Sequence, residues 1–134
     1  MQTFIVTLDN RPGELARVTE AIATKGIDIT TLAGVTCGGD GAIALLTNDE
    51  AATRRALADA KCDVRELELV SASIPNRPGE LAKVVRRLAD AGVNIEAALP
   101  VGMTGGNVTV AFGTSDAAKA RSAIGETVLA ASGA

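Results

Sequence analysis

The stretch Asn10-Arg11-Pro12-Gly13-Glu14-Leu15-Ala16 is repeated without change 66 residues later as Asn76-Arg77-Pro78-Gly79-Glu80-Leu81-Ala82. The same spacing relates Gly26 to Gly92 further along the chain. A seven-residue identity that keeps its register over this distance indicates a tandem duplication. The sequence therefore predicts two domains of one kind in a chain of 134 residues.

Each copy shows the same order of expected elements, β-α-β-β-α-β. Hydrophobic residues alternate in the strand segments and return every three or four positions in the first helix, where Leu15, Val18 and Ile22 form the stripe. We expect Pro12 and Pro78 in the first turn of these helices. The expected strands are 3–8, 27–36, 42–46 and 64–67 in the first copy and 70–74, 93–101 and 108–112 in the second, with further helices at 49–61 and 115–125.

This order is the ferredoxin-like plan, an antiparallel sheet with two helices on one face, and it places the chain in the α+β class. We expect one repeat at residues 1–67 and a second at 68–134, whose last strand, at 127–132, is short or missing. A single copy of about 66 residues would bury little surface. We therefore expect the two repeats to pack as one unit with antiparallel sheets.

The composition argues against several classes of function. The chain has no His, no Trp, no Tyr, only two Phe and two Cys, and a net charge of −3. Without His, the common nucleophile–base pairs and His metal sites are excluded, so we expect no catalytic residue, no metal and no cofactor. The negative charge and scarce aromatic residues argue against nucleic-acid and membrane partners. No signal-peptide or membrane-spanning pattern is present, so we expect a cytoplasmic protein.

The repeated stretch lies where a strand ends and a helix begins. A helix start presents unpaired backbone N–H groups and the positive end of the helix dipole. Gly13 and Gly79 leave room for a small carboxylate there, and the amides of Asn10 and Asn76 can both donate and accept hydrogen bonds. Such a loop suits a ligand that carries an ammonium and a carboxylate group. The alternative interpretation is that the stretch is simply a good turn and helix start.

The succession of strand, Asn-Arg-Pro-Gly-Glu-Leu-Ala, amphipathic helix and Gly-Ile-Asp-Ile (26–29) or Gly-Val-Asn-Ile (92–95) resembles the ACT domain, twice, over essentially the whole chain. ACT domains are small amino-acid-sensing regulatory modules. The resemblance implies that an amino acid binds where two copies meet, between the loop of one copy and the start of the second strand of the other. The ligand-binding residues that it implies are Asp9, Asn10, Arg11, Pro12, Gly13, Glu14, Leu15, Asp28, Ile29, Asn76, Arg77, Pro78, Gly79, Glu80, Leu81, Asn94 and Ile95.

The resemblance also implies two unequal sites. Asn94 fits the family pattern, whereas Asp28 adds a negative charge near a bound ammonium group, and Pro75 replaces Asp9 ahead of the second loop. The implied function is an amino-acid-sensing regulatory protein, without enzymatic activity, that forms a homodimer and acts on a metabolic enzyme. Two rivals stay open: an interaction module that regulates a partner enzyme without a ligand, and a small enzyme that uses Asp28 with a Lys or Arg.

Overall fold

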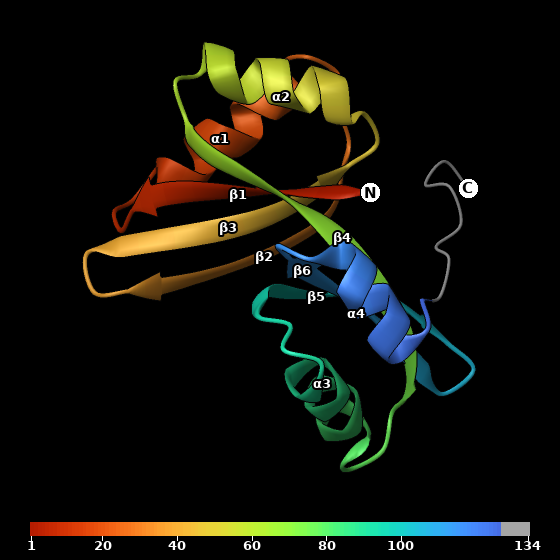
Figure 1. The fold of residues 1–134 in the computed structure, drawn as a ribbon. Coiled ribbons are helices and arrows are strands. Elements are labelled where there is room, and N and C mark those ends of the chain that lie inside the picture. The colour runs from red at the N-terminus through yellow and green to blue at the C-terminus, as the bar shows by residue number, and fades with distance from the viewer. Residues whose placement is uncertain (127–134) are drawn as a thin grey trace. The chain divides into compact units, whose positions relative to one another are not determined.

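Figure 1 shows the computed structural model of the protein, which describes residues 1–126. The chain divides into two compact units, one of residues 2–66 and one that begins at Leu67. The expected strand at 127–132 lies outside the described residues.

The first unit is an antiparallel sheet with two helices on one face. Its elements are β1 (Gln2–Asp9), α1 (Glu14–Ala23), β2 (Ile29–Cys37), β3 (Asp40–Thr47) and α2 (Glu50–Asp59). β3 pairs with both β1 and β2, and the order is β2-β3-β1. The alternating residues of β1 and β3 bury one face against the helices. This core contains Phe4, Val6, Leu8, Val18, Ile22, Ile43, Leu45, Ala56 and Leu57.

The second unit repeats this plan. Its elements are β4 (Asp63–Pro75) from Leu67 onward, α3 (Glu80–Asp90), β5 (Ile95–Thr104), β6 (Asn107–Thr114) and α4 (Ala117–Ile124). β6 pairs with both β4 and β5, so the order is β4-β6-β5. Its core contains Val70, Ala72, Ile74, Val84, Leu88, Val93, Phe112, Ala120 and Ile124. The structure thus confirms the α+β class and the antiparallel, ferredoxin-like order.

β4 is one strand of 13 residues where the sequence predicts two segments, 64–67 and 70–74. The intervening Glu68 and Leu69 continue the extended chain because no Gly or Pro interrupts it before Pro75. The division between the two units falls inside this strand, after Glu66. The packing of the repeats as one unit and the domain bounds 1–67 and 68–134 stay predictions.

The spacing between equivalent residues changes from 66 to 67 within the second repeat, so the spacing of 66 that relates the repeated stretches does not hold from β6 onward. Asp9 pairs with Asp40 in the first unit, and its counterpart Pro75 pairs with Asn107 in the second. The physical reason is an irregularity in the β5–β6 register at Pro100, which gives β5 one residue more than β2.

Leu15 is exposed, although the helical stripe predicts it in the core, and its counterpart Leu81 is exposed as well. Their exposed fractions are 45% and 51%, whereas Val18, Ile22 and Leu88 are fully buried. Both leucines lie in the first turn of their helices, at the rim of the two surface hollows described below. Each side chain therefore keeps one side in solvent.

Candidate functional site

The loop that leads into α1 ends in a glycine whose backbone conformation other residues rarely adopt. Gly13 is the N-cap residue of α1 with φ 90°, and Gly79 is that of α3 with φ 85°. The expectation that Pro12 and Pro78 lie in the first turn of each helix is wrong: both precede the glycine. The left-handed glycine redirects the chain, so the helix begins only at the following Glu.

The helices that follow the repeated loops, α1 and α3, lack a side-chain cap, in contrast to α2 and α4. The carboxylates of Asp49 and Asp116 accept hydrogen bonds from the backbone N–H of Ala52 and Lys119, each at 3.0 Å, and cap α2 and α4. At α1 and α3 the N-cap is glycine and no side chain accepts from the first turn. The backbone N–H groups of Glu14 and Glu80 donate to the carbonyls of Arg11 and Arg77 at 3.4 and 3.3 Å. The positive dipole end and the remaining first-turn donors at these two loops are therefore open to an anionic group.

Asn10 ties the first loop to the β2–β3 turn. Its backbone N–H donates to the carbonyl of Gly39 at 2.9 Å, and its amide Nδ2 donates to that of Gly38 at 3.0 Å. In the second unit the backbone N–H of Asn76 donates to the carbonyl of Gly106 at 2.9 Å. The Asn10 side chain thus has a structural role, which was not predicted from the sequence.

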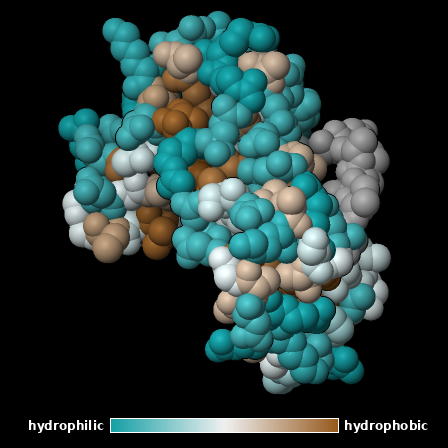
Figure 2. Space-filling view, in the orientation of Figure 1, coloured by the Kyte–Doolittle hydropathy of each residue, from teal (hydrophilic) through white to brown (hydrophobic). Residues whose placement is uncertain are grey.

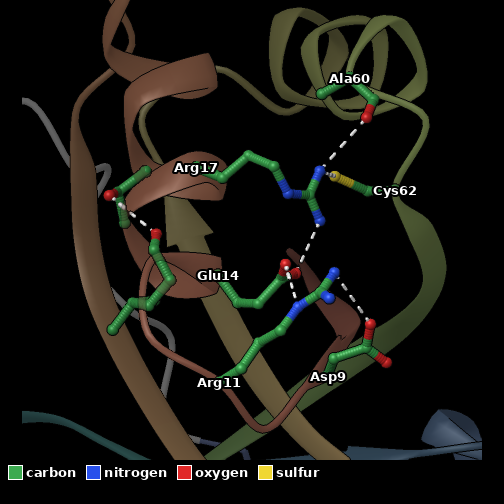
Figure 3. A network of polar contacts seen from close by, with 8 residues as sticks. Asp9, Arg11, Glu14, Arg17, Ala60 and Cys62 are labelled. Atoms are coloured by element: carbon green, nitrogen blue, oxygen red, sulfur yellow. Dashed lines mark hydrogen bonds and ion pairs between the residues drawn. The ribbon is translucent and has the colours of Figure 1, made fainter.

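A network of ion pairs surrounds the first loop (Figure 3). Arg11 lies between the carboxylates of Asp9, at 3.3 Å, and Glu14, at 3.2 Å. Arg17 also reaches Glu14 at 3.2 Å and donates to the carbonyl of Ala60 at 3.4 Å. The hydrogen bond from Arg17 is the main cause that holds the pKa of Glu14 below its usual range, and Arg11 adds to it. Glu14 is therefore an anion that neutralises the loop cations.

The second loop has a simpler version of this network. Glu80 pairs with Arg77 at 3.4 Å and with Lys83 at 3.2 Å. Both copies of the repeated stretch thus place an Arg three residues before a Glu that it pairs with. This pairing gives a structural reason for the presence of Arg and Glu in both copies.

Each loop borders a hollow in the surface of its own unit. The hollow of the first unit measures about 450 Å³, and that of the second about 210 Å³. Five of the implied ligand-binding residues line the first: Asp9, Asn10, Arg11, Glu14 and Leu15. Three line the second: Asn76, Arg77 and Leu81. Pro12, Gly13, Pro78, Gly79 and Glu80 belong to the loops but are not among the residues that line them.

The comparisons with known proteins bear on the fold. No protein-family model and no curated protein matches the chain. A solved structure, protein BT0572 from Bacteroides thetaiotaomicron, is 28% identical over 98% of this chain and 92% of its own, with a TM-score of 0.76. The ligand-free regulatory subunit of aspartate kinase from Thermus thermophilus is 21% identical over 91% and 87%, with a TM-score of 0.62. The structure of the aspartokinase alpha and beta subunits is 19% identical over 91% of this chain and 88% of its own, with a TM-score of 0.64.

The chain has the ACT-domain fold. It spans nearly the whole length of these structures, so both ACT repeats have counterparts there.

Within one ACT repeat, the implied second-strand residues lie far from the loop. β2 begins at Ile29, which pairs with Thr47, whereas Asp9 pairs with Asp40 at the other end of β3. The backbone N–H of Asp28 donates to the side chain of Asn48 at 2.9 Å. Asn94 and Ile95 hold the equivalent place, since Ile95 pairs with Thr114 at the end of β6. A meeting of these residues with a loop of another repeat stays a prediction.

The second wall of the first hollow was not predicted from the sequence. This wall comes from the β2–β3 hairpin and consists of Leu32, Gly34, Val35, Thr36, Gly41, Ala42 and Ile43. Two glycines on adjacent strands of one sheet are the sequence signal that could have indicated a gap in the side-chain layer at this point. Within residues 1–126, no cluster of three or more Cys, Asp or Glu side chains could hold a metal ion. Nor is any helix of these residues long and apolar enough to cross a membrane.

Proposed function

We propose that this chain is a regulatory protein that binds an amino acid at its repeated loops, where ACT repeats meet. The observation that carries the proposal is the pair of uncapped helix starts, α1 and α3, each beside a hollow, whereas α2 and α4 are capped by Asp. A ligand carboxylate would accept hydrogen bonds from the open backbone N–H groups. The carboxylate of Asp9 and the amide oxygen of Asn10 supply acceptors for an ammonium group.

The regulatory role is part of the same proposal. A similar fold serves in the protein described as the regulatory subunit of aspartate kinase. By analogy, occupancy of the loops would be passed to a metabolic enzyme, through a homodimer of this chain. No step of catalysis is proposed.

A thermal-shift assay across the twenty amino acids tests this function. A ligand present at about 100 times its Kd stabilises the native state by about 2.7 kcal/mol, which raises Tm by several degrees. The variants Asn10→Ala and Asn94→Ala, checked for folding by circular dichroism, are expected to weaken this response. Undiminished binding in both variants would refute the site assignment.

The second candidate is a non-catalytic interaction module that regulates an enzyme without a ligand. The internal contacts of the repeated stretch favour it, because Asn10 and Arg11 already have partners within the repeat. This candidate predicts no thermal shift with any amino acid and a stable complex with a partner enzyme in a pull-down. If none of the twenty amino acids raises Tm and such a complex forms, the second proposal replaces the first.

A further inference from the structure

The two repeats carry hollows of different size, although their loops are identical in sequence. Small-molecule sites in proteins commonly measure about 300–1,000 Å³. The hollow of the first unit, at about 450 Å³, lies within this range, and that of the second, at about 210 Å³, lies below it. The duplicated loop therefore opens onto a cavity of useful size in only one of the two described units.

Two substitutions between the repeats explain the difference. Gly41 pairs with Leu8 at the floor of the first hollow, and in the second repeat Val108 pairs with Ile74 at the same place. Gly34 pairs with Ile43 beside it, where the second repeat has Pro100 against Val110. The second repeat thus places side chains where the first has none.

Gly34 and Gly41 have little room for a side chain, because neighbouring atoms lie close to their backbone. A Cβ added at Gly34 would lie 3.0 Å from Cγ2 of Ile43, and one at Gly41 would lie 3.2 Å from Cγ2 of Thr36. Any side chain at these positions would crowd the floor. The size of the first hollow therefore depends on both glycines.

The first hollow is apolar at its walls and polar at its rim. Leu15 from α1 and Leu32 from β2 both line it and remain 45% and 41% exposed. Figure 2 shows hydrophobic surface over the first unit, near β2, among hydrophilic residues. When an apolar group covers the exposed leucines that face one hollow, their apolar surface is removed from water, which favours binding. An aliphatic side chain fits these walls better than a charged one.

The rims differ as well. Asp9 supplies a carboxylate at the rim of the first hollow, and Pro75 takes its place in the second. Only the first rim can thus pair a ligand ammonium group with an anionic side chain at this position. The size of the hollow and the charge at its rim both favour a ligand site in the first repeat.

We propose that the hollow of the first repeat holds the aliphatic side chain of one amino-acid ligand per chain, and that the second repeat binds none. This inference rests on the proposed amino-acid-binding function and goes further by naming the side-chain class and the repeat. Leu15 and Leu32 contact the side chain, and the start of α1 and Asp9 hold its carboxylate and ammonium groups.

Isothermal titration calorimetry of the full chain with L-leucine, L-isoleucine, L-valine and L-serine tests the proposal. We expect one site per chain and binding of at least one of the three aliphatic amino acids at least tenfold tighter than that of L-serine. Leu15→Ser removes apolar contacts from the first hollow and is expected to weaken binding about tenfold, the effect of losing about two buried methylene groups. Leu81→Ser is the matched control in the second repeat and should leave Kd unchanged.

Both substitutions affect half-exposed side chains, so the variants should fold, which circular dichroism checks. A methyl NMR titration of the unaltered protein gives an independent readout: the Leu15 and Leu32 signals shift and that of Leu81 does not. Two sites per chain, preference for serine, or equal weakening by the two substitutions would overturn this inference and leave the proposed function standing. If none of the twenty amino acids binds, the proposed function itself fails.

Discussion

One buried hydroxyl in the second unit has lost the partner that its counterpart keeps in the first. In the first unit the hydroxyls of Thr47 and Thr53 lie 2.6 Å apart, and that of Thr53 also donates to the Asp49 carbonyl at 2.7 Å. Thr114 is the counterpart of Thr47, and its Oγ1 is buried without a hydrogen-bond partner among the described residues. Ala120 stands where the first unit has Thr53 and cannot supply one.

Replacing each threonine by valine should therefore have opposite effects on the free energy of unfolding. Valine has nearly the same shape, so the packing changes little while the hydroxyl is removed. Thr47→Val loses a made hydrogen bond and is expected to destabilise the protein by about 1 kcal/mol. Thr114→Val removes a hydroxyl whose unsatisfied burial costs about 1–3 kcal/mol, so it is expected to stabilise by about 1 kcal/mol.

Urea denaturation followed by far-UV circular dichroism measures both changes, since the chain has no Trp or Tyr to serve as a fluorescent probe. The midpoint should fall for Thr47→Val and rise for Thr114→Val with an unchanged slope. Equal destabilisation by the two substitutions would show that Thr114 has a partner in solution and would refute the argument.

Three further perturbations follow from the loops and the ion pairs. Gly13→Ala should cost about 1 kcal/mol, because the residue has φ 90° and nothing within 4 Å of an added Cβ compensates; urea midpoints measure this, and an unaltered midpoint would contradict it. Asn10→Ala should destabilise more than Asn76→Ala, by about 1 kcal/mol, because the Asn10 amide donates to Gly38; equal midpoints would argue against that bond. The hydrogen bond from Arg54 holds the pKa of Glu66 below its usual range. The stabilisation of the native state by this pair is therefore present above about pH 4.3 and is lost as pH falls through the lower pKa of the folded protein. Glu66→Gln should reduce the loss of unfolding free energy at acid pH, measured by urea denaturation across this range, and an unchanged pH dependence would count against the pair.

The strands and helices follow from local patterns and could be predicted from the sequence. Alternation in β1 and β6, the three-and-four spacing of Val18 and Ile22, and the turn glycines act over a few residues each. The change of spacing at Pro100 could not be predicted, because a strand irregularity depends on the partner strand rather than on composition.

The candidate site could be predicted only in part. Asn10 and Glu14 could be predicted because the repeated stretch marks them, and both line the first hollow, as does the preceding Asp9. Leu32 and Gly41 were missed because they come from the hairpin, which approaches the loop only once β3 has paired with β1. Asp28 was placed near the site by resemblance, and within its own repeat it lies at the other end of the sheet.

The 13-residue strand β4 has a practical consequence for handling this protein. Proteases cut exposed, mobile loop tips, and duplicated domains are commonly separated by cleavage at the segment that joins them. Here the junction after Glu66 lies within a paired strand in which Leu67, Leu69 and Val70 are buried. Limited digestion with trypsin should therefore leave Asp63–Pro75 uncut, including the bond after Arg65, and yield no isolated half from native protein.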